Sequence, residues 1–149
     1  MQDVHAAAAI DGDWFKTGDI ANLDADGFLS ITDRKKDLIK TSGGKFIAPQ
    51  PIENSLKANR FIADAAILGD RRRFAAVVIV PAFSALEEWV TQNRLFFHSR
   101  QELVASPQEQ SLYQGIVEQV NHNLARFEQL KKILIIPEEL SIEDGTLTP

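Results

Sequence analysis

The sequence predicts an α+β protein, in which an N-terminal β-hairpin and a charged hinge precede a small domain of helices packed on a mostly antiparallel sheet. Short β-rich runs are separated by glycine-containing turns, which is typical of hairpins. Later segments place apolar residues at helical spacing behind serine and proline start signals. The 149 residues allow one modest core. We therefore expect about three sheet strands and one further short hairpin.

Two hairpins are predicted in the first third of the chain. The first has its turn at residues 24–27, Asp-Ala-Asp-Gly, between short apolar runs. The second has its turn at Ser42-Gly43-Gly44, between residues 38–41 and 45–48. Proline lacks the N–H that a strand ladder needs but suits a first helical turn. The two prolines at positions 49 and 51 therefore predict a helix directly after this hairpin.

The remaining elements follow from apolar runs and helix start signals. Residues 61–68 and 75–80 are apolar and predict an antiparallel pair in the core. Serine followed three residues later by glutamate, at Ser84 and again at Ser106, predicts two helix starts. Residues 133–136 predict a last buried strand. The least order is expected at residues 95–105 and at both termini.

Composition excludes several classes of function. Sixteen cations against 21 acids give a net charge of −5, which argues against a general nucleic-acid binder. The absence of cysteine excludes disulfides and thiol catalysis. The three histidines have no metal-ligand spacing, and residues 24–27 are too short for a calcium loop, so we predict no metal site. The longest apolar runs are far too short to span a bilayer.

Two segments carry a resemblance to a known family. Residues 14–20 read WFKTGDI, and residues 32–53 combine five cations, a Gly-Gly turn and two prolines. Together they resemble the acyl-adenylate-forming ligases, and the form GGKFIAPQPIE resembles the long-chain fatty acid–CoA ligases in particular. From the residues alone, these segments would be interpreted as turns and a solvated charged run.

The resemblance implies a nucleotide site at Asp19 and Arg34. The matching Asp accepts hydrogen bonds from both ribose hydroxyls of ATP or AMP, a task that suits an acceptor-only carboxylate. The matching Arg reaches the ribose and phosphate region, where a planar and permanently charged fork fits. Without the family, Asp19 would be interpreted as a turn residue and Arg34 as a solvated charge.

The resemblance also implies a hinge and a loop that approaches the thiol co-substrate. Lys36, with Lys35 as the neighbouring candidate, would be the pivot about which the C-terminal domain rotates between two catalytic arrangements. The loop at residues 42–44 would present its backbone to the pantetheine of CoA, because a glycine such as Gly43 has no Cβ to narrow the channel. We expect the CoA-binding residues to be Ser42, Gly43, Gly44 and Lys45, with Lys40 serving the second half-reaction.

Taken as a whole, the resemblance predicts the C-terminal part of an AMP-forming acyl-CoA synthetase. Residues 1–33 would end a large N-terminal adenylation domain, and residues 34–149 would form the mobile lid domain. Residues 145–149 resemble the run just before the catalytic lysine of the family, which we expect shortly after Pro149. This stretch alone is expected to be inactive.

The parent would use a fatty acid, ATP with Mg²⁺, and CoA, and its main partner would be the N-terminal domain of the same chain. We expect a cytoplasmic location, with peripheral membrane contact left open. Two alternatives remain open as well. One is a non-catalytic docking or regulatory domain with the same fold. The other is the lid of a ligase that adenylates an aryl or amino acid.

Overall fold

A computed structural model of the chain describes residues 10–138, apart from the side chain of Asp33. The chain divides into two compact units between Leu38 and Ile39. The division falls a few residues after the domain boundary that the charge pattern predicts at residues 33–34. Each unit is described by itself below.

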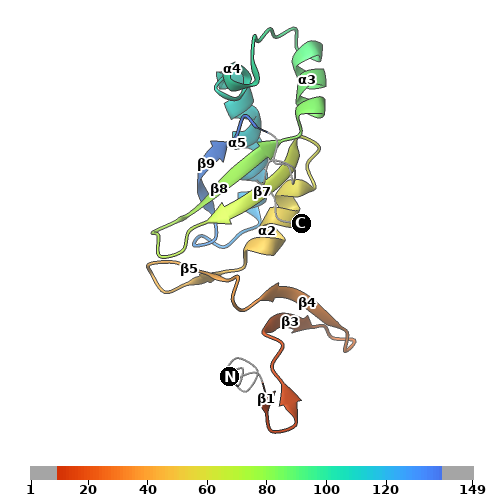
Figure 1. Ribbon diagram of the computed structural model, residues 1–149, viewed down its shortest axis with the longest axis vertical. Helices are drawn as coiled ribbons and strands as arrows, with labels where there is room; N and C mark the ends of the chain where they lie inside the picture. The colour runs from red at the N-terminus through yellow and green to blue at the C-terminus, as the bar shows by residue number, and fades with distance from the viewer. Residues whose placement is uncertain (1–9, 139–149) are drawn as a thin grey trace, which may run out of the picture. The chain divides into compact units, whose positions relative to one another are not determined.

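The first unit consists of two antiparallel hairpins (Figure 1). Strands β1 (Ile10–Asp11) and β2 (Trp14–Phe15) form a short hairpin that the sequence analysis did not predict. Strands β3 (Asp19–Leu23) and β4 (Leu29–Arg34) form the predicted hairpin, which is confirmed.

The turn between β3 and β4 is stabilised by one aspartate. Asp24 Oδ1 accepts the backbone N–H groups of Asp26 at 3.0 Å and Phe28 at 2.9 Å. An aspartate that bonds the backbone two residues ahead is typical of such turns. Trp14 and Phe28 remain 80% and 71% exposed, so this unit buries little of its own apolar surface.

The second unit begins with the predicted glycine-loop hairpin and helix. Strands β5 (Ile39–Lys40) and β6 (Phe46–Ile47) pair in antiparallel orientation, and α2 (Pro49–Lys57) follows at once. Helix α2 places Pro49 in its first turn and buries Ile52 and Leu56, which lie four residues apart on one face. The predicted hairpin and the predicted helix are both confirmed.

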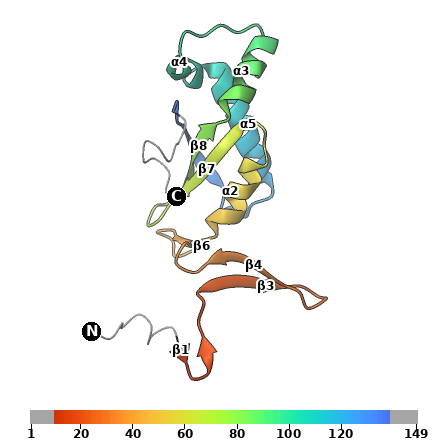
Figure 2. The same ribbon diagram turned by 45° about the vertical axis from the view of Figure 1, so that its right-hand side comes forward.

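A three-stranded sheet forms the centre of the second unit (Figure 2). Its order is β7 (Ile62–Leu68), β8 (Ala75–Pro81) and β9 (Leu130–Ile135). The β7–β8 pair is antiparallel, as predicted, whereas β9 runs parallel to β8. Four of the five strand pairings among the described residues are antiparallel, so the predicted α+β class with a mostly antiparallel sheet is confirmed.

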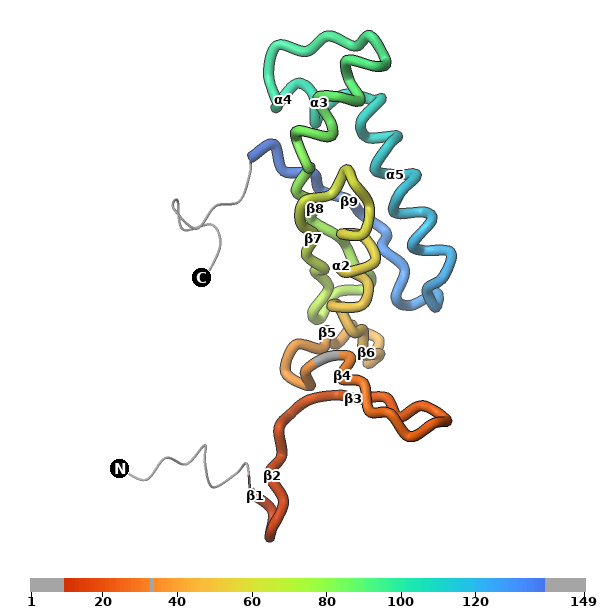
Figure 3. The backbone as a smooth tube through the Cα atoms, turned by 90° about the vertical axis from the view of Figure 1, so that its right-hand side faces the viewer, coloured from red at the N-terminus to blue at the C-terminus, as the bar shows by residue number. Residues whose placement is uncertain are grey.

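The helices between β8 and β9 provide the long connection that two parallel strands require. They are α3 (Phe83–Gln92), α4 (Arg100–Val104) and α5 (Pro107–His122). The tube view in Figure 3 follows this path from the top of β8 through the helices and back into β9. Helices α2 and α5 pack together and supply one side of the main core, with the three sheet strands on the other.

The core has a main part and a smaller one. The main cluster includes Leu56 of α2, Val77 of β8 and Tyr113 of α5, each fully buried. The smaller cluster joins Phe83 and Leu86 of α3 to Leu103 of α4. Trp89 and Phe97 pack against the smaller cluster. Phe96 does not, since it is 90% exposed.

The two predicted helix caps had different outcomes. At Ser106, the Oγ atom accepts the N–H of Glu109 at 3.2 Å and α5 begins at the next residue, so this cap is confirmed. At Ser84 the prediction is wrong, because α3 begins one residue earlier and its N-cap is Ala82, without a side-chain bond. Phe83, the first residue of α3, is buried in the smaller core cluster, which favours a helix start at this residue.

Two further expectations need correction. The region 95–105 contains helix α4, whose N-cap Ser99 accepts the N–H of Glu102 at 3.1 Å. The sequence analysis overlooked this cap. The last strand starts at Leu130 rather than at residue 133 and is only partly buried, because Leu134 is 62% exposed.

Candidate functional site

The β3–β4 hairpin brings Asp19 and Arg34 together. The two residues are cross-strand partners, and Arg34 Nε lies 3.5 Å from Asp19 Oδ1. Residues directly opposite each other on paired strands have neighbouring side chains, which explains the contact. The Asp19 side chain is 25% exposed and the Arg34 side chain 61% exposed.

The backbone around Asp19 is fixed by local hydrogen bonds. The Asp19 N–H donates to Thr17 Oγ1 at 3.2 Å, and the Lys35 N–H donates to the carbonyl of Gly18 at 2.7 Å. A carboxylate offers about four acceptor positions, so one ion pair leaves capacity for further donors. The pair can therefore present acceptor oxygens beside a fixed positive charge.

The predicted pivot residues lie in an exposed turn. Lys35, Lys36 and Asp37 follow β4 directly, and the Asp37 N–H donates to the Arg34 carbonyl at 3.0 Å. The side chains of Lys35 and Lys36 are exposed. The boundary between the two compact units follows at Leu38, so this turn lies in the last residues of the first unit.

The glycine loop is a tight hairpin turn held at its base by Thr41. The Gly44 N–H donates to the Thr41 carbonyl at 2.9 Å, and the Thr41 N–H donates to the Lys45 carbonyl at 2.9 Å. The Thr41 hydroxyl also donates to the Lys45 carbonyl at 3.1 Å and accepts the Lys45 N–H at 3.2 Å. A three-residue loop whose last residue is left-handed is a common hairpin connection.

The two glycines of this loop have different backbone requirements. Gly44 has φ +76°, in the left-handed region that side chains disfavour. Gly43 lies outside that region, and a Cβ added there would meet only Thr41 Oγ1, at 4.0 Å. Both glycines are exposed. The backbone thus favours a glycine at position 44, whereas nothing in the described structure favours one at position 43.

The lysines beside the loop lie over aromatic rings. Lys40 Nζ is 5.5 Å from the centre of the Phe46 ring, and Lys45 Nζ is 5.9 Å from the centre of the Phe127 ring. Attraction between an ammonium and a ring face is worth about 0.5–1 kcal/mol at exposed sites. Both ammonium groups therefore have a preferred position next to the loop while remaining available to an anion.

The sequence of residues 71–73, Arg-Arg-Arg, predicts a solvated turn between two strands, with a contact to a CoA phosphate as the alternative. The structure joins this turn to the glycine loop by backbone hydrogen bonds. The Ser42 N–H donates to the Arg72 carbonyl at 2.9 Å, and the Arg71 N–H donates to the Lys40 carbonyl at 2.8 Å. No local sequence pattern predicts this contact, because it depends on how β5 packs against the β7–β8 turn.

One buried carboxyl stands apart from these sites. Glu109, in the first turn of α5, is fully buried, and neither of its side-chain oxygens has a hydrogen-bond partner among the described residues. Burial disfavours the charged form and raises the pKa of Glu109 to about 7. Burial, together with the nearby Glu109 carboxyl, also raises the pKa of Tyr113. This carboxyl belongs to the core rather than to either candidate site.

Glu53 connects helix α2 to the sheet. Helix α2 begins at Pro49, so Glu53 lies beyond its first turn. Its Oε1 accepts the backbone N–H of Ile67 at 2.9 Å and so ties α2 to strand β7. Within residues 10–138, no group of three His, Asp or Glu side chains could hold a metal ion.

Comparison with known proteins assigns the fold to a family. The AMP-binding enzyme C-terminal domain family matches residues 36–144. The chain belongs to this family. The resemblance predicted from residues 14–20 and 32–53 is therefore confirmed at the level of the family.

Curated relatives of this AMP-binding C-terminal domain are fatty acid–CoA ligases. The chain is 37% identical over 137 residues to the long-chain-fatty-acid–CoA ligase FadD15 of Mycobacterium tuberculosis. This match covers 91% of the chain and 23% of FadD15. The chain is also 35% identical over 150 residues to long-chain-fatty-acid–CoA ligase 1 of Homo sapiens, a match that covers 96% of the chain and 21% of that ligase. The chain thus spans less than a quarter of the length of these relatives.

Solved structures support the same fold. The adenylation domain of a carboxylic acid reductase from Segniliparus rugosus, in complex with AMP and a carboxylic acid, matches with a TM-score of 0.73 at 21% identity, over 95% of this chain and 21% of that one. O-succinylbenzoate coenzyme A synthetase from Bacillus subtilis, in complex with ATP and magnesium, matches with a TM-score of 0.57 at 22% identity. This match covers 88% of the present chain and 22% of the synthetase. Among the described helices, none is both long and apolar enough to cross a membrane.

Proposed function

We propose that this AMP-binding C-terminal domain serves an AMP-forming long-chain fatty acid–CoA ligase. The observation that carries the proposal is the 37% identity over 137 residues to a long-chain ligase. In the proposed reaction a fatty acid and ATP give acyl-AMP and pyrophosphate, and the thiol of CoA then displaces AMP. Residues 1–33 would belong to the large adenylation domain and residues 34–149 to the mobile lid. We place the enzyme in the cytoplasm.

In the first half-reaction, Asp19 and Arg34 would bind the nucleotide. The Asp19 carboxylate would accept hydrogen bonds from the two ribose hydroxyls, and Arg34 would contact the phosphate side of the ribose. Their neighbouring positions on β3 and β4 support this division of roles. ATP would arrive with Mg²⁺, but the described residues do not form a metal site, so we assign none of them to the ion.

In the second half-reaction, the glycine loop would approach the thiol arm of CoA. The exposed Gly43 has free space around its Cβ position, which supports a backbone surface against which a narrow chain can lie. Ser42, Gly44 and Lys45 would border the same path. Lys40, on the strand that enters the loop, would contribute positive charge to this step.

The turn at Lys35 and Lys36 would be the pivot between the two steps. Exposed side chains can remain hydrated while the backbone dihedral angles change, and a turn of a few residues can absorb such a change. The substitution Lys36→Pro tests this proposal, because proline fixes φ near −65°. We expect one half-reaction to be lost and the other retained. Equal activity in both half-reactions would contradict the pivot.

The decisive experiment separates the two half-reactions in a full-length protein that contains this chain. ATP–pyrophosphate exchange measures adenylation, and acyl-CoA formation from supplied acyl-AMP measures thioester formation. Gly43→Leu should slow thioester formation on the order of 100-fold, as expected for a misplaced reactant, while exchange continues. Gly115→Leu is the matched control, because a Cβ at this position in α5 meets nothing within 4 Å. Equal loss of both steps would refute the loop assignment.

The choice of acid decides between the remaining alternatives. A panel of fatty, aryl and amino acids in the exchange assay should show activity with long-chain fatty acids. Preferential exchange with an aryl or amino acid would assign the lid to a different adenylating ligase. Exchange with no acid at all would instead favour the non-catalytic docking domain.

A further inference from the structure

The connection between α3 and α4 exposes one aromatic side chain almost completely. Phe96 is 90% exposed, the highest value among the exposed large hydrophobic residues that the structure describes. Its two chain neighbours are partly buried, because Phe97 packs against the smaller core cluster and Leu95 lines a hollow beside α5. The Phe96 ring is thus left in solvent between two residues that pack on the protein.

Backbone hydrogen bonds hold both ends of this connection. At the end of α3, the Leu95 N–H donates to the Val90 carbonyl at 3.0 Å, a bond typical of helix ends that turn through a left-handed residue. Before α4, the His98 N–H donates to Glu102 Oε2 at 2.8 Å. Phe96 therefore projects from a segment that is fixed on either side of it.

The left-handed residue at the end of α3 is an arginine. Arg94 has φ 55°, at a position where glycine is usual because a Cβ is disfavoured there. Residues held in such a backbone conformation occur preferentially at functional sites. The Arg94 side chain is exposed, and it takes part in no ion pair within the described residues. A cation is thus fixed two residues before the exposed ring.

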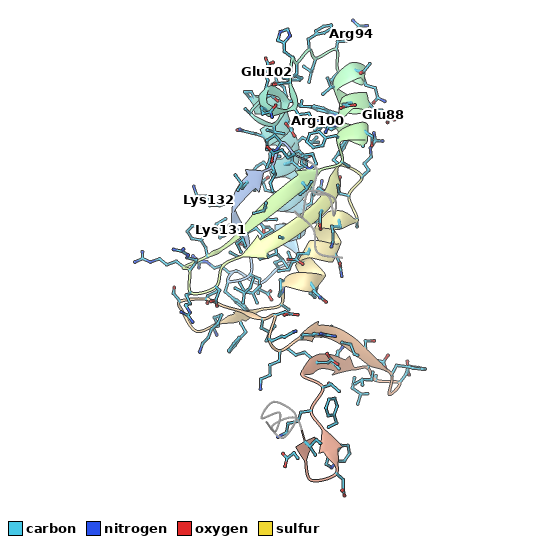
Figure 4. The ribbon with its side chains drawn as sticks, in the orientation of Figure 1. Glu88, Arg94, Arg100, Glu102, Lys131 and Lys132 are labelled. Carbon is cyan, nitrogen blue, oxygen red and sulfur yellow. The ribbon has the colours of Figure 1, made fainter. Side chains whose placement is uncertain are left out.

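The connection lacks negative charge in a chain that is acidic overall. Residues 89–101 contain no acid, although the chain has 21. The acids that flank this segment are engaged, since Glu87 lies 3.7 Å from Arg100 and Glu88 lies 3.8 Å from Arg60. Arg94 lies on the connection at one end of the second unit (Figure 4). This end therefore presents a cation and an apolar ring without an acid between them.

A hollow extends the apolar surface from Leu95 towards α5. Its volume is about 520 Å³, and Trp89, Leu95 and Pro107 contribute to its lining. Tryptophan, with an apolar body and one polar N–H group, is enriched where a bilayer meets water. Arginine can bury its aliphatic stem in the same boundary while its charged head stays in water. The residue types of this surface thus match those of a membrane interface.

The size of this surface favours a bilayer over a protein partner. A stable protein interface buries about 800 Å² on each partner, whereas a single aromatic side chain supplies about 150–250 Å². A bilayer surface, in contrast, accepts one inserted ring, and the negative charge of acidic lipids attracts a neighbouring cation. The projecting ring and the cation together suit an anionic lipid surface.

We propose that the α3–α4 connection is a contact site for an anionic lipid bilayer, in which Phe96 enters the apolar boundary and Arg94 meets lipid phosphate groups. Trp89 and Leu95 lie at the level of the headgroups. The contact is reversible, because one ring and one cation provide less than a stable anchor requires. The proposal does not depend on the ligase function proposed above.

A tryptophan placed at position 96 tests insertion directly. The 149-residue chain with Trp14→Phe, Trp89→Phe and Phe96→Trp is mixed with phosphatidylglycerol vesicles whose acyl chains are brominated. Its fluorescence should shift to shorter wavelength and be quenched, because bromine quenches only a ring that reaches the acyl chains. The matched control carries Leu134→Trp in place of Phe96→Trp, since Leu134 is also an exposed apolar residue of the second unit, at 62%. It should show neither change.

Two substitutions test the separate roles of the ring and the cation in vesicle sedimentation. Phe96→Ala should weaken binding to phosphatidylglycerol vesicles about tenfold or more, because an apolar side chain is no longer buried. Arg94→Ala should weaken it about fivefold and leave the weaker binding to phosphatidylcholine unchanged. The matched controls are Leu134→Ala and Arg126→Ala, which remove an exposed apolar side chain and a cation elsewhere in the unit. Thermal unfolding of each variant shows whether it is folded.

Quenching at position 96 without quenching at position 134, together with weaker binding of both test variants, supports the proposal. Absence of quenching at position 96, or equal quenching at the two positions, overturns it. Losses of binding no larger than those of the controls also overturn it. Self-association that depends on Phe96, seen by analytical ultracentrifugation without lipid, would assign this surface to a second copy of the chain instead. None of these measurements uses adenylation activity, so a failure of the proposed ligase function would be seen separately.

Discussion

The two adjacent glycines of the hairpin loop allow a sharp test of what the fold requires and what a ligand requires. Gly43→Ala and Gly44→Ala add the same methyl group to neighbouring residues of one turn. At position 43 the methyl group meets only Thr41 Oγ1, at 4.0 Å. At position 44 it meets no atom within 4 Å, but the backbone has φ +76°. Space is therefore available at both sites, and the backbone angle is the difference.

The expected magnitudes follow from this difference. Replacing glycine by alanine at a compatible position stabilises a protein by about 0.4–1 kcal/mol, because the unfolded chain loses freedom. This gain applies to both variants and cancels in their comparison. The left-handed backbone then costs Gly44→Ala about 1–2 kcal/mol. Gly43→Ala should be the more stable variant by this amount, a gap of roughly 4–8 °C in melting temperature at about 4 °C per kcal/mol.

The measurement is urea and thermal unfolding of the 149-residue chain. Trp89 packs against the smaller core cluster of the second unit, whereas Trp14 lies in the first unit and is 80% exposed. In a Trp14→Phe background, fluorescence therefore reports unfolding of the unit that carries the loop. A Gly43→Ala variant that loses as much stability as Gly44→Ala would refute the reasoning. If Gly43→Ala is stable, a defect in thioester formation at this position reflects the approach of a ligand.

Three further predictions concern the helical layer. Glu109→Gln should raise the free energy of unfolding at pH 8, by on the order of 3 kcal/mol, and change it little at pH 5. Burial raises the pKa of Glu109 from 4.5 to about 7, so ionising this carboxyl destabilises the native state as pH rises between these values. The glutamine side chain does not ionise and avoids this cost. Urea unfolding at both pH values measures the free energy of unfolding, and an equal effect of the substitution at both would contradict the explanation. Asn121→Ala should lower the free energy of unfolding by about 1–3 kcal/mol, because the Asn121 side chain accepts the Leu130 N–H at 2.8 Å and donates to the Leu130 carbonyl at 3.0 Å. Faster amide hydrogen exchange in β9 is expected, and slower exchange than in the parent chain would argue against a stabilising role for these two hydrogen bonds. Gly115→Ala, at an open position within α5, should stabilise the unit by about 0.8–1 kcal/mol through helix propensity, and a lower melting temperature would show that the position is less open than the structure indicates.

Local sequence signals predicted the hairpins and α2 well, because each depends on residues within one turn. Residues 24–27 and 42–44 supply the turn chemistry themselves, and the prolines at positions 49 and 51 suit only a strand end or a first helical turn. Strands β7 and β8 were also predicted, since apolar residues on both faces of a short run indicate a buried strand. In these elements local preference and tertiary packing agree.

The serine caps show where local signals stop being sufficient. Serine followed three residues later by glutamate occurs at positions 84, 99 and 106, yet only Ser99 and Ser106 cap a helix. The pattern at Ser84 is overridden because α3 starts directly after β8, with its first residue Phe83 buried in the smaller core cluster. Burial of an aromatic side chain outweighs a cap worth about 1 kcal/mol.

The sequence by itself determined the α+β class and the family, and it predicted the candidate site residues, which are Gly43, Gly44, Lys35, Lys36, Asp19 and Arg34. These depend on residue type and on short spacing. Only the tertiary structure decided the parallel placement of β9, the burial of Glu109 and the contact between the β7–β8 turn and the glycine loop. Each of these joins segments that lie far apart in the chain, and such contacts are selected by packing and backbone hydrogen bonding rather than by local preference.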